Sequence, residues 1–227
     1  EPFIETQVKA MGIKCRGKEL FTVLGEYSAA MIRKAVTGES LEYKAAEVAP
    51  RPPVMCAGCP HRPVFYVLSK LKYIVSGDIG CYSLGSGKPL NAIDAVMCMG
   101  ASVGMAHGIE KANAELSKKT VAIIGDSTFI HSGITGLINA AYNGGSLTLI
   151  ILDNSTTGMT GHQDHPATGY TLKKKEAKRL NLESICHSCG ADSVRVVDAY
   201  DMAQIEKAVR EEAESDRVSV IIARRPC

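Results

Sequence analysis

The chain has 227 residues and a formal net charge of +2, a length that fits one large domain, or one domain with a short extension. The near-balanced charge and the lack of a long Lys/Arg block argue against nucleic-acid binding. No apolar run reaches the roughly 18 residues that a membrane-spanning helix needs, and no secretory signal is visible. We therefore expect a cytoplasmic protein that binds neither nucleic acid nor membrane.

The first 47 residues are mixed and charged, and we expect one helix over 25–36 that ends at Gly38. A boundary follows, marked by three closely spaced prolines: Pro50, Pro52 and Pro53. We interpret 1–47 as a connecting segment from an upstream domain and 48–227 as the main domain.

From residue 54 onward, helical and strand-like patterns alternate. The expected strands are short, continuous apolar runs, typical of parallel strands buried on both faces: 73–76, 92–98, 120–124, 147–152, 194–197 and 218–223. The expected helices cover 60–71, 101–116, 132–143, 173–189 and 201–215. This alternation predicts an α/β fold with a doubly wound, mostly parallel sheet and helices on both faces. Ligands of such folds bind at the carboxyl ends of the strands.

Polar residues follow two of these strands. Gly125-Asp126-Ser127 ends one buried strand and Asp153-Asn154 ends another, which puts Asp126 and Asn154 28 positions apart. One strand–helix–strand crossover takes about this length and returns the chain beside the first strand. Both side chains should therefore face the same crevice.

This pair suits a magnesium–diphosphate site. Mg²⁺ prefers oxygen ligands, usually one or two protein side chains together with phosphate oxygens and water. Asp126, Asn154 and the backbone carbonyl of Thr156 are our candidate ligands. Gly125 lets the backbone approach a phosphate, and amides at the start of the next helix add donors. The structural alternative is that Asp126 only caps a helix and Asp153-Asn154 only forms a turn.

Gly-Asp-Ser followed by Asn at this spacing resembles the thiamine-diphosphate motif, in which the third residue is usually Gly rather than Ser127. Four stretches together extend the resemblance: Cys56-Ala-Gly-Cys59-Pro-His-Arg62, Gly77-Asp-Ile-Gly-Cys81-Tyr82, Gly125-Asp-Ser-Thr-Phe129 with His131-Ser-Gly133, and Met159-Thr-Gly-His-Gln-Asp-His-Pro166. The glycine-rich run 97–108 resembles the helix start upstream of that motif. Over roughly 50–227 the chain is similar to the large (alpha) subunit of the indolepyruvate:ferredoxin oxidoreductases, within the 2-oxoacid:ferredoxin oxidoreductases.

The resemblance implies a reaction and a set of partners. An aryl 2-oxoacid such as indolepyruvate is decarboxylated on thiamine diphosphate, coenzyme A takes the acyl group, and two electrons pass through iron–sulfur clusters to ferredoxin. A second subunit, a dimeric assembly and an upstream pyrimidine-binding domain with the activating Glu are also implied. The chain begins at Glu1 without a methionine and stops at Cys227 after a strand-like run. We therefore expect a fragment that binds the cofactor weakly and does not turn over alone.

The resemblance also places the cofactor against loop residues. The expected cofactor-binding residues are Gly80, Cys81, Met99, Gly100, Gly125, Asp126, Ser127, Thr128, Asn154, Thr156, Thr157, Gly158 and Met159. His162 and His165 are expected to stabilise developing charge or bind a carboxylate, the alternative being an ordinary surface loop. His131 is a candidate for a phosphate contact or a helix cap, and His61 for packing or capping at its helix.

The eight cysteines are expected to be reduced, because the chain is too long and too rich in βα units to need a disulfide scaffold. Four of them resemble the family's ligands for a [4Fe–4S] cluster: Cys56, Cys59, Cys81 and Cys227. The alternatives are that they form pocket walls, or that the first two bind zinc. Cys186 and Cys189 share the spacing but have no second pair, and we assign them a structural role.

Two other functions stay open at this point. Gly100-Ala-Ser102-Val-Gly104 matches the nucleophile elbow of serine hydrolases, with Asp126 or Asp153 and then His162 following in hydrolase order. A noncatalytic cofactor-binding module is the second alternative, because a fragment without the pyrimidine-binding domain would bind the cofactor without catalysing the reaction.

Overall fold

The computed structural model describes residues 2–40 and 46–227, and the chain divides into two units, Glu1–Arg51 and Pro52–Cys227. The first unit contains helices α1 (Phe3–Ala10) and α2 (Ala29–Thr37). Helix α2 begins four residues later than expected, because the Ser28 hydroxyl accepts a hydrogen bond from the Met31 amide at 3.3 Å and so caps the helix. It ends as predicted at Gly38, whose φ of 77° is typical of a glycine that terminates a helix.

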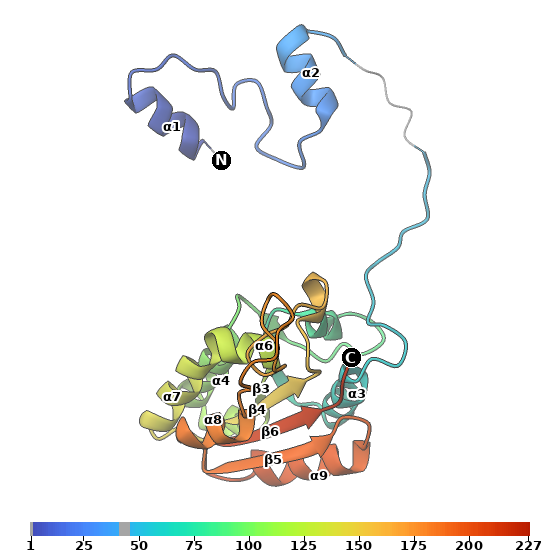
Figure 1. Ribbon diagram of the computed structural model, residues 1–227, viewed down its shortest axis with the longest axis vertical. Helices are drawn as coiled ribbons and strands as arrows, with labels where there is room; N and C mark the ends of the chain where they lie inside the picture. The colour runs from blue at the N-terminus through green and yellow to red at the C-terminus, as the bar shows by residue number, and fades with distance from the viewer. Residues whose placement is uncertain (1, 41–45) are drawn as a thin grey trace. The chain divides into compact units, whose positions relative to one another are not determined.

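The second unit is built on a parallel sheet (Figure 1). Its six strands are β1 (Ile74–Gly77), β2 (Ala95–Val96), β3 (Thr120–Gly125), β4 (Thr148–Asp153), β5 (Ser193–Asp198) and β6 (Ser219–Arg224). All neighbours pair in parallel in the order β2-β1-β3-β4-β6-β5, which confirms the predicted fold class. The chain runs from β1 outward to β2 and then returns past β1 to β3. The carboxyl ends of β1 and β3 therefore flank a topological switch point, where such sheets bind ligands.

The helices of this unit are α3 (His61–Leu71), α4 (Ala101–Ala112), α5 (Ala114–Ser117), α6 (Asp126–Thr128), α7 (Ile134–Tyr142), α8 (Leu182–Ser188) and α9 (Met202–Ala213). The expected helix 101–116 is broken, because Asn113 caps α5 by accepting from the Glu115 and Leu116 amides. The expected helix 132–143 starts earlier, since α6 continues through a π-helical turn, Phe129–Gly133, into α7. The expected helix 173–189 is wrong before Leu182, where Asn181 caps α8. The expected strand 92–98 shrinks to Ala95–Val96.

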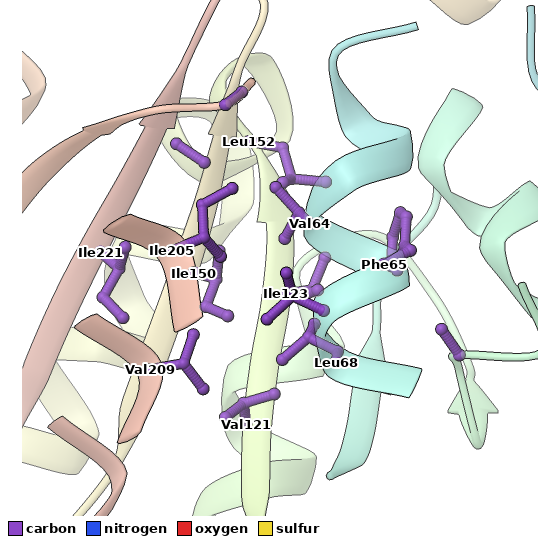
Figure 2. Close-up of a cluster of buried hydrophobic side chains, with 14 of the residues drawn as sticks. Val64, Phe65, Leu68, Val121, Ile123, Ile150, Leu152, Ile205, Val209 and Ile221 are labelled. Carbon is purple, nitrogen blue, oxygen red and sulfur yellow. The ribbon is translucent and has the colours of Figure 1, made fainter. Parts of the chain in front are cut away.

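The sheet has an apolar core on each face. On one face, side chains of β3, β4 and β6 pack against α3 and α9 (Figure 2): Val64, Phe65, Leu68, Val121, Ile123, Ile150, Leu152, Ile205, Val209 and Ile221. The alternate residues of the same strands, Ala122 and Ile124 among them, pack on the other face against α4, α7 and α8. Burial on both faces explains why these strands are continuously apolar. Among residues 2–40 and 46–227, the helices are too short or too polar to span a bilayer.

Candidate functional site

A cavity of about 140 Å³ opens at the carboxyl ends of β1, β3 and β4. Most of the residues expected to bind the cofactor line it: Gly80, Cys81, Met99, Gly125, Asp126, Ser127, Thr128, Asn154, Thr156, Thr157, Gly158 and Met159. Four further lining residues were not expected: His61, Ile79, Tyr82 and Thr160. The sheet therefore brings five separate chain segments to one place, and their roles toward a cofactor stay predictions.

Gly100 is the one expected cofactor residue that does not line the cavity. It precedes α4 with a φ of 87°, and a β-carbon there would lie 2.6 Å from the Ser132 carbonyl oxygen. Its amide donates to the Asp78 carboxylate at 2.9 Å, as does the Ser102 amide at 3.1 Å. The glycine thus serves the start of α4, and Asp78, which sequence reasoning missed, is the buried cap of that helix.

Asp126 is buried at the end of β3 and its carboxylate accepts three hydrogen bonds. Oδ1 accepts from the Ser127 amide at 2.8 Å, and Oδ2 accepts from the Ser155 amide at 2.9 Å and lies 3.2 Å from Nε2 of His165. Ser155 adopts a φ of 56°, which turns its amide toward Asp126. Burial raises the pKa of Asp126, while His165 and the Ser127 amide oppose that rise.

Asn154 faces Asp126, as the crossover length predicted. In the absence of a cation, the Asn154 amide satisfies its neighbours only when its nitrogen donates to the Thr156 carbonyl oxygen at 2.8 Å and to Asp126 Oδ1 at 3.3 Å. A cation reverses this requirement, because the amide oxygen can then join those two oxygens around one positive charge. The distances of 2.8 and 3.3 Å from the Asn154 amide to the Thr156 carbonyl oxygen and to Asp126 Oδ1 lie on either side of the separation of about 2.9 Å between neighbouring oxygens around octahedral Mg²⁺. The three groups therefore fit a magnesium ion.

The charge of the cavity lining points the same way. No Lys or Arg lines the cavity in the described part of the chain, so a bound diphosphate would need its charge neutralised by a cation. Hydroxyl groups gather there instead, and the Thr157 hydroxyl donates to the Ser127 hydroxyl at 2.8 Å. Ser127, which departs from the usual motif glycine, thus joins the end of β3 to the loop after β4.

The floor of the cavity is aromatic. A β-carbon at Gly125 would lie 2.6 Å from the Tyr82 ring, so the packing of this ring by itself requires a glycine here, and the approach of a phosphate to Gly125 stays a prediction. The Tyr82 hydroxyl donates to the Ile79 carbonyl at 2.9 Å, and burial raises its pKa. His61 packs edge-on against Tyr82 with ring centroids 6.0 Å apart, which agrees with the packing role expected for His61 at the start of its helix. Burial lowers the pKa of His61 to about 4, so its ring is neutral at pH 7.

The two histidines expected to contact substrate lie outside the cavity. His165 is 4% exposed, bonds the Asp126 carboxylate and does not line the cavity, and its expected role toward substrate stays a prediction. His162 is exposed, and its Nε2 lies 3.8 Å from the Cys227 sulfur. His131 is also exposed and bonds the Ser127 carbonyl oxygen through Nδ1 at 2.7 Å rather than reaching the cavity. Sequence spacing alone could not reveal these orientations.

The four candidate cluster cysteines are free thiols, and Cys81 lines the cavity. Burial raises the pKa of Cys59 and Cys81, and charge on Cys227 and Cys56 raises both further. The Cys227 amide donates to the Asn154 carbonyl oxygen at 3.0 Å, which fixes the end of the chain beside the site.

These cysteines do not form a site for a single metal ion. In the described ranges, no three His, Cys, Asp or Glu side chains are arranged to hold one ion, so the zinc alternative finds no ligand set. In a [4Fe–4S] cluster each cysteine sulfur binds a different iron, so the four sulfurs lie farther apart than the ligands of a single ion. The lack of a single-ion site therefore does not test the cluster prediction. Cys186 is buried, and burial raises its pKa to about 12, as expected for a structural thiol.

The serine-hydrolase alternative is wrong. Ser102 is fully buried inside α4, and within the described residues its hydroxyl has no hydrogen-bond partner. A nucleophilic serine needs a base within hydrogen-bonding reach and an open path to substrate, and Ser102 has neither.

An ion-pair network lies behind the site and was not expected from the sequence. Arg224 donates to Asp153 at 2.6 Å and to both oxygens of Glu183 at 2.9 and 3.0 Å. The Ser155 amide lies 3.2 Å from Asp153 Oδ1 as well as bonding Asp126. The network therefore ties β4, β6 and α8 to the loop that carries Asn154.

Comparisons with known proteins show which family the chain belongs to. The family model for the thiamine pyrophosphate enzyme, C-terminal TPP binding domain, matches residues 78–223. The whole chain aligns with indolepyruvate oxidoreductase subunit IorA of Archaeoglobus fulgidus at 41% identity and of Pyrococcus horikoshii at 36%, and spans 40% of each. 2-Oxoglutarate synthase subunit KorB of A. fulgidus is 30% identical, over 75% of this chain and 68% of that protein.

Solved structures show the same fold. A 2-oxoglutarate:ferredoxin oxidoreductase from Magnetococcus marinus matches with a TM-score of 0.65 at 16% identity, over 79% of this chain and 66% of that one. Benzoylformate decarboxylase from Polynucleobacter necessarius matches with a TM-score of 0.53 at 17% identity, over 78% and 37% of the two chains. The chain belongs to the thiamine pyrophosphate enzyme family and carries its C-terminal TPP-binding domain.

Proposed function

We propose that this chain binds thiamine diphosphate through Mg²⁺ as the cofactor-binding part of an indolepyruvate-type 2-oxoacid:ferredoxin oxidoreductase. When bound, thiamine diphosphate supplies the carbanion-stabilising group that decarboxylation of an aryl 2-oxoacid requires. The names of the relatives support the substrate class, and the chain spans 40% of their length. The proposal therefore includes a pyrimidine-binding domain, a second subunit, coenzyme A and ferredoxin as partners, in a dimeric cytoplasmic enzyme.

The convergence of three oxygen groups at one point carries this proposal. In this proposal, Mg²⁺ is held by Asp126, Asn154 and the Thr156 carbonyl, because their spacing fits one octahedral ion. The cation is needed because the described cavity lining offers no Lys or Arg to a diphosphate. The hydroxyls of Ser127, Thr128 and Thr157 line the same cavity and donate to phosphate oxygens. His61 and Tyr82 exclude water from its floor.

The four cysteines bind a [4Fe–4S] cluster in this proposal. Cys81 supports it by lining the cavity, since electrons must leave the cofactor over a short distance. Burial raises the pKa of Cys59 and Cys81, and repulsion from the thiolates of Cys227 and Cys56 raises both pKa values further, which supports a shared site for the four sulfurs. Four bound irons would relieve that repulsion.

Calorimetric titration of the 227-residue chain with thiamine diphosphate tests the cofactor site. We expect binding with Mg²⁺ present and none with EDTA, and we expect Asp126→Asn to weaken it at least tenfold. Asp216→Asn, which alters an exposed carboxylate on the loop before β6, is the matched control. Magnesium-independent binding, or equal binding by Asp126→Asn, would contradict the proposal.

Anaerobic iron analysis of the full-length subunit tests the cluster. Cys59→Ala should remove about four irons per subunit, whereas Cys189→Ala should remove none. Equal iron content in both variants would refute a cluster at these cysteines.

A further inference from the structure

We infer that His165 is a positioning residue for Asp126, which it holds so that one carboxylate acceptor site faces the proposed magnesium ion. This role rests on the proposed function, because it concerns the metal ligand of that site. It differs from the substrate contact that the sequence suggested, since the His165 ring is sealed behind the carboxylate and does not reach the cavity.

Hydrogen bonding fixes which ring nitrogen of His165 carries the proton. The Ala167 amide donates to Nδ1 at 3.3 Å, so Nδ1 is the bare nitrogen of a neutral ring. The proton then sits on Nε2, which lies 3.2 Å from Asp126 Oδ2 and donates to it. The Thr168 hydroxyl and amide both donate to the His165 carbonyl oxygen, at 2.9 and 2.8 Å, and hold the backbone in place.

The acceptor sites of Asp126 show what this donor achieves. A carboxylate has about four acceptor positions, two on each oxygen. The amides of Ser127 and Ser155 take one on Oδ1 and one on Oδ2, and His165 takes the second on Oδ2. The single position left is on Oδ1, the oxygen that faces Asn154. Three N–H donors therefore orient the carboxylate, and its remaining lone pair points toward the proposed ion.

Loss of the His165 donor would free a second position on Oδ2. The Asp126 carboxylate could then rotate. Its negative charge, which burial and the nearby Asp153 already disfavour, would also lose one hydrogen-bond donor. Groups that orient a metal ligand in this way typically change metal affinity by about 10–100-fold when they are removed. His165 should therefore affect metal binding without touching metal, cofactor or substrate.

Electron paramagnetic resonance of Mn²⁺, titrated into the 227-residue chain with thiamine diphosphate, tests this role. We expect His165→Leu to weaken Mn²⁺ binding about tenfold or more, and His165→Gln, whose amide can donate to Oδ2, to restore most of it. His187→Leu, on the exposed side of α8, is the control and should bind as the unaltered chain does. Denaturant unfolding of each variant separates a loss of metal affinity from a loss of stability.

The outcomes are distinct. Unaltered Mn²⁺ affinity in His165→Leu, or equal loss in His165→Gln and His165→Leu, would overturn the positioning role alone. Failure of the unaltered chain to bind Mn²⁺ would overturn the metal site itself, and this role with it.

A second measurement needs no variant. Long-range ¹H–¹⁵N correlation spectra of the unaltered chain report which nitrogen of His165 is protonated, and we expect Nε2–H with a bare Nδ1. A proton on Nδ1 alone would overturn the inference, even if every His165 variant failed to fold.

Discussion

The ring of Tyr82 lies against Gly125, where a β-carbon would come within 2.6 Å of the ring atom Cε1. The Tyr82 hydroxyl is held by the Ile79 carbonyl, so the ring cannot easily move aside. We expect Gly125→Ala to lower the free energy of unfolding by about 1–3 kcal/mol, as overpacking does. Chemical denaturation measures this change.

Two further variants separate overpacking from a general intolerance of alanine. Tyr82→Leu combined with Gly125→Ala should recover part of the loss, with a coupling energy of about 0.5–3 kcal/mol. Gly108→Ala, in α4 with nothing within 4 Å of the added carbon, should be neutral or slightly stabilising. If the effects of Tyr82→Leu and Gly125→Ala were strictly additive, the Tyr82 ring would not be the cause of the destabilisation by Gly125→Ala.

Asp78 caps α4 with a carboxylate that accepts from the amides of Ile79, Gly100 and Ser102. Asp78→Asn should cost about 2 kcal/mol of unfolding free energy, because an amide nitrogen would replace an oxygen that faces N–H donors. Asp201→Asn at the exposed start of α9 is the control and should change little, since Asn and Asp cap helices equally well. Similar losses at both positions would argue against a special role for the buried cap.

The pair between Glu183 and Arg224 should make stability depend on pH. Hydrogen bonds from Arg224 hold the pKa of the Glu183 carboxyl below its usual value of 4.5. A group with a lowered folded-state pKa stabilises the protein above its unfolded value, and this stabilisation is lost as the pH falls through the folded value. The unaltered chain should therefore lose more stability between pH 6 and pH 3 than Glu183→Gln does, as urea unfolding at each pH would show. The same pH dependence in both proteins would rule this contribution out.

Ile123 is fully buried in the core between the sheet and α3 (Figure 2). Ile123→Ala should reduce the free energy of unfolding by about 2–5 kcal/mol, through lost burial and the cavity left behind. Ile138→Ala, on the half-exposed side of α7, should change it by less than about 0.5 kcal/mol. Thermal unfolding of the two variants compares these sites directly, and equal shifts would contradict the assignment of this core.

Much of the fold was predictable because its signals are local. Apolar runs identified five strands nearly to the residue. Four of them, β1, β3, β4 and β6, are buried on both faces, whereas the edge strand β5 is only partly buried and includes Arg195. The errors fall where side chains override the pattern, as at Asn113, which splits one expected helix, and at Asn181, which starts another late. The segment 173–181 looked helical from its charged composition, but it folds back through a turn in which Lys174 has a φ of 58°.

Most of the candidate site was also predictable, because the residues that follow β3 and β4 must meet at one edge of a parallel sheet. Orientation was not predictable. The sequence placed His165 in the loop after β4 but did not predict its hydrogen bond to Asp126, and it did not predict that Tyr82 packs against Gly125. Contacts of this kind depend on backbone dihedrals such as that of Ser155, which the residue types do not reveal.

By itself, the sequence determined the alternation of strands and helices, the family and the pair Asp126 and Asn154, because each of these is set by residue order along the chain. Only the tertiary structure decided which donors hold Asp126, why residue 125 is glycine and why Ser102 cannot act as a nucleophile. The physical reason is that a hydrogen bond or a steric contact joins residues far apart in sequence, over distances that only the packed chain defines.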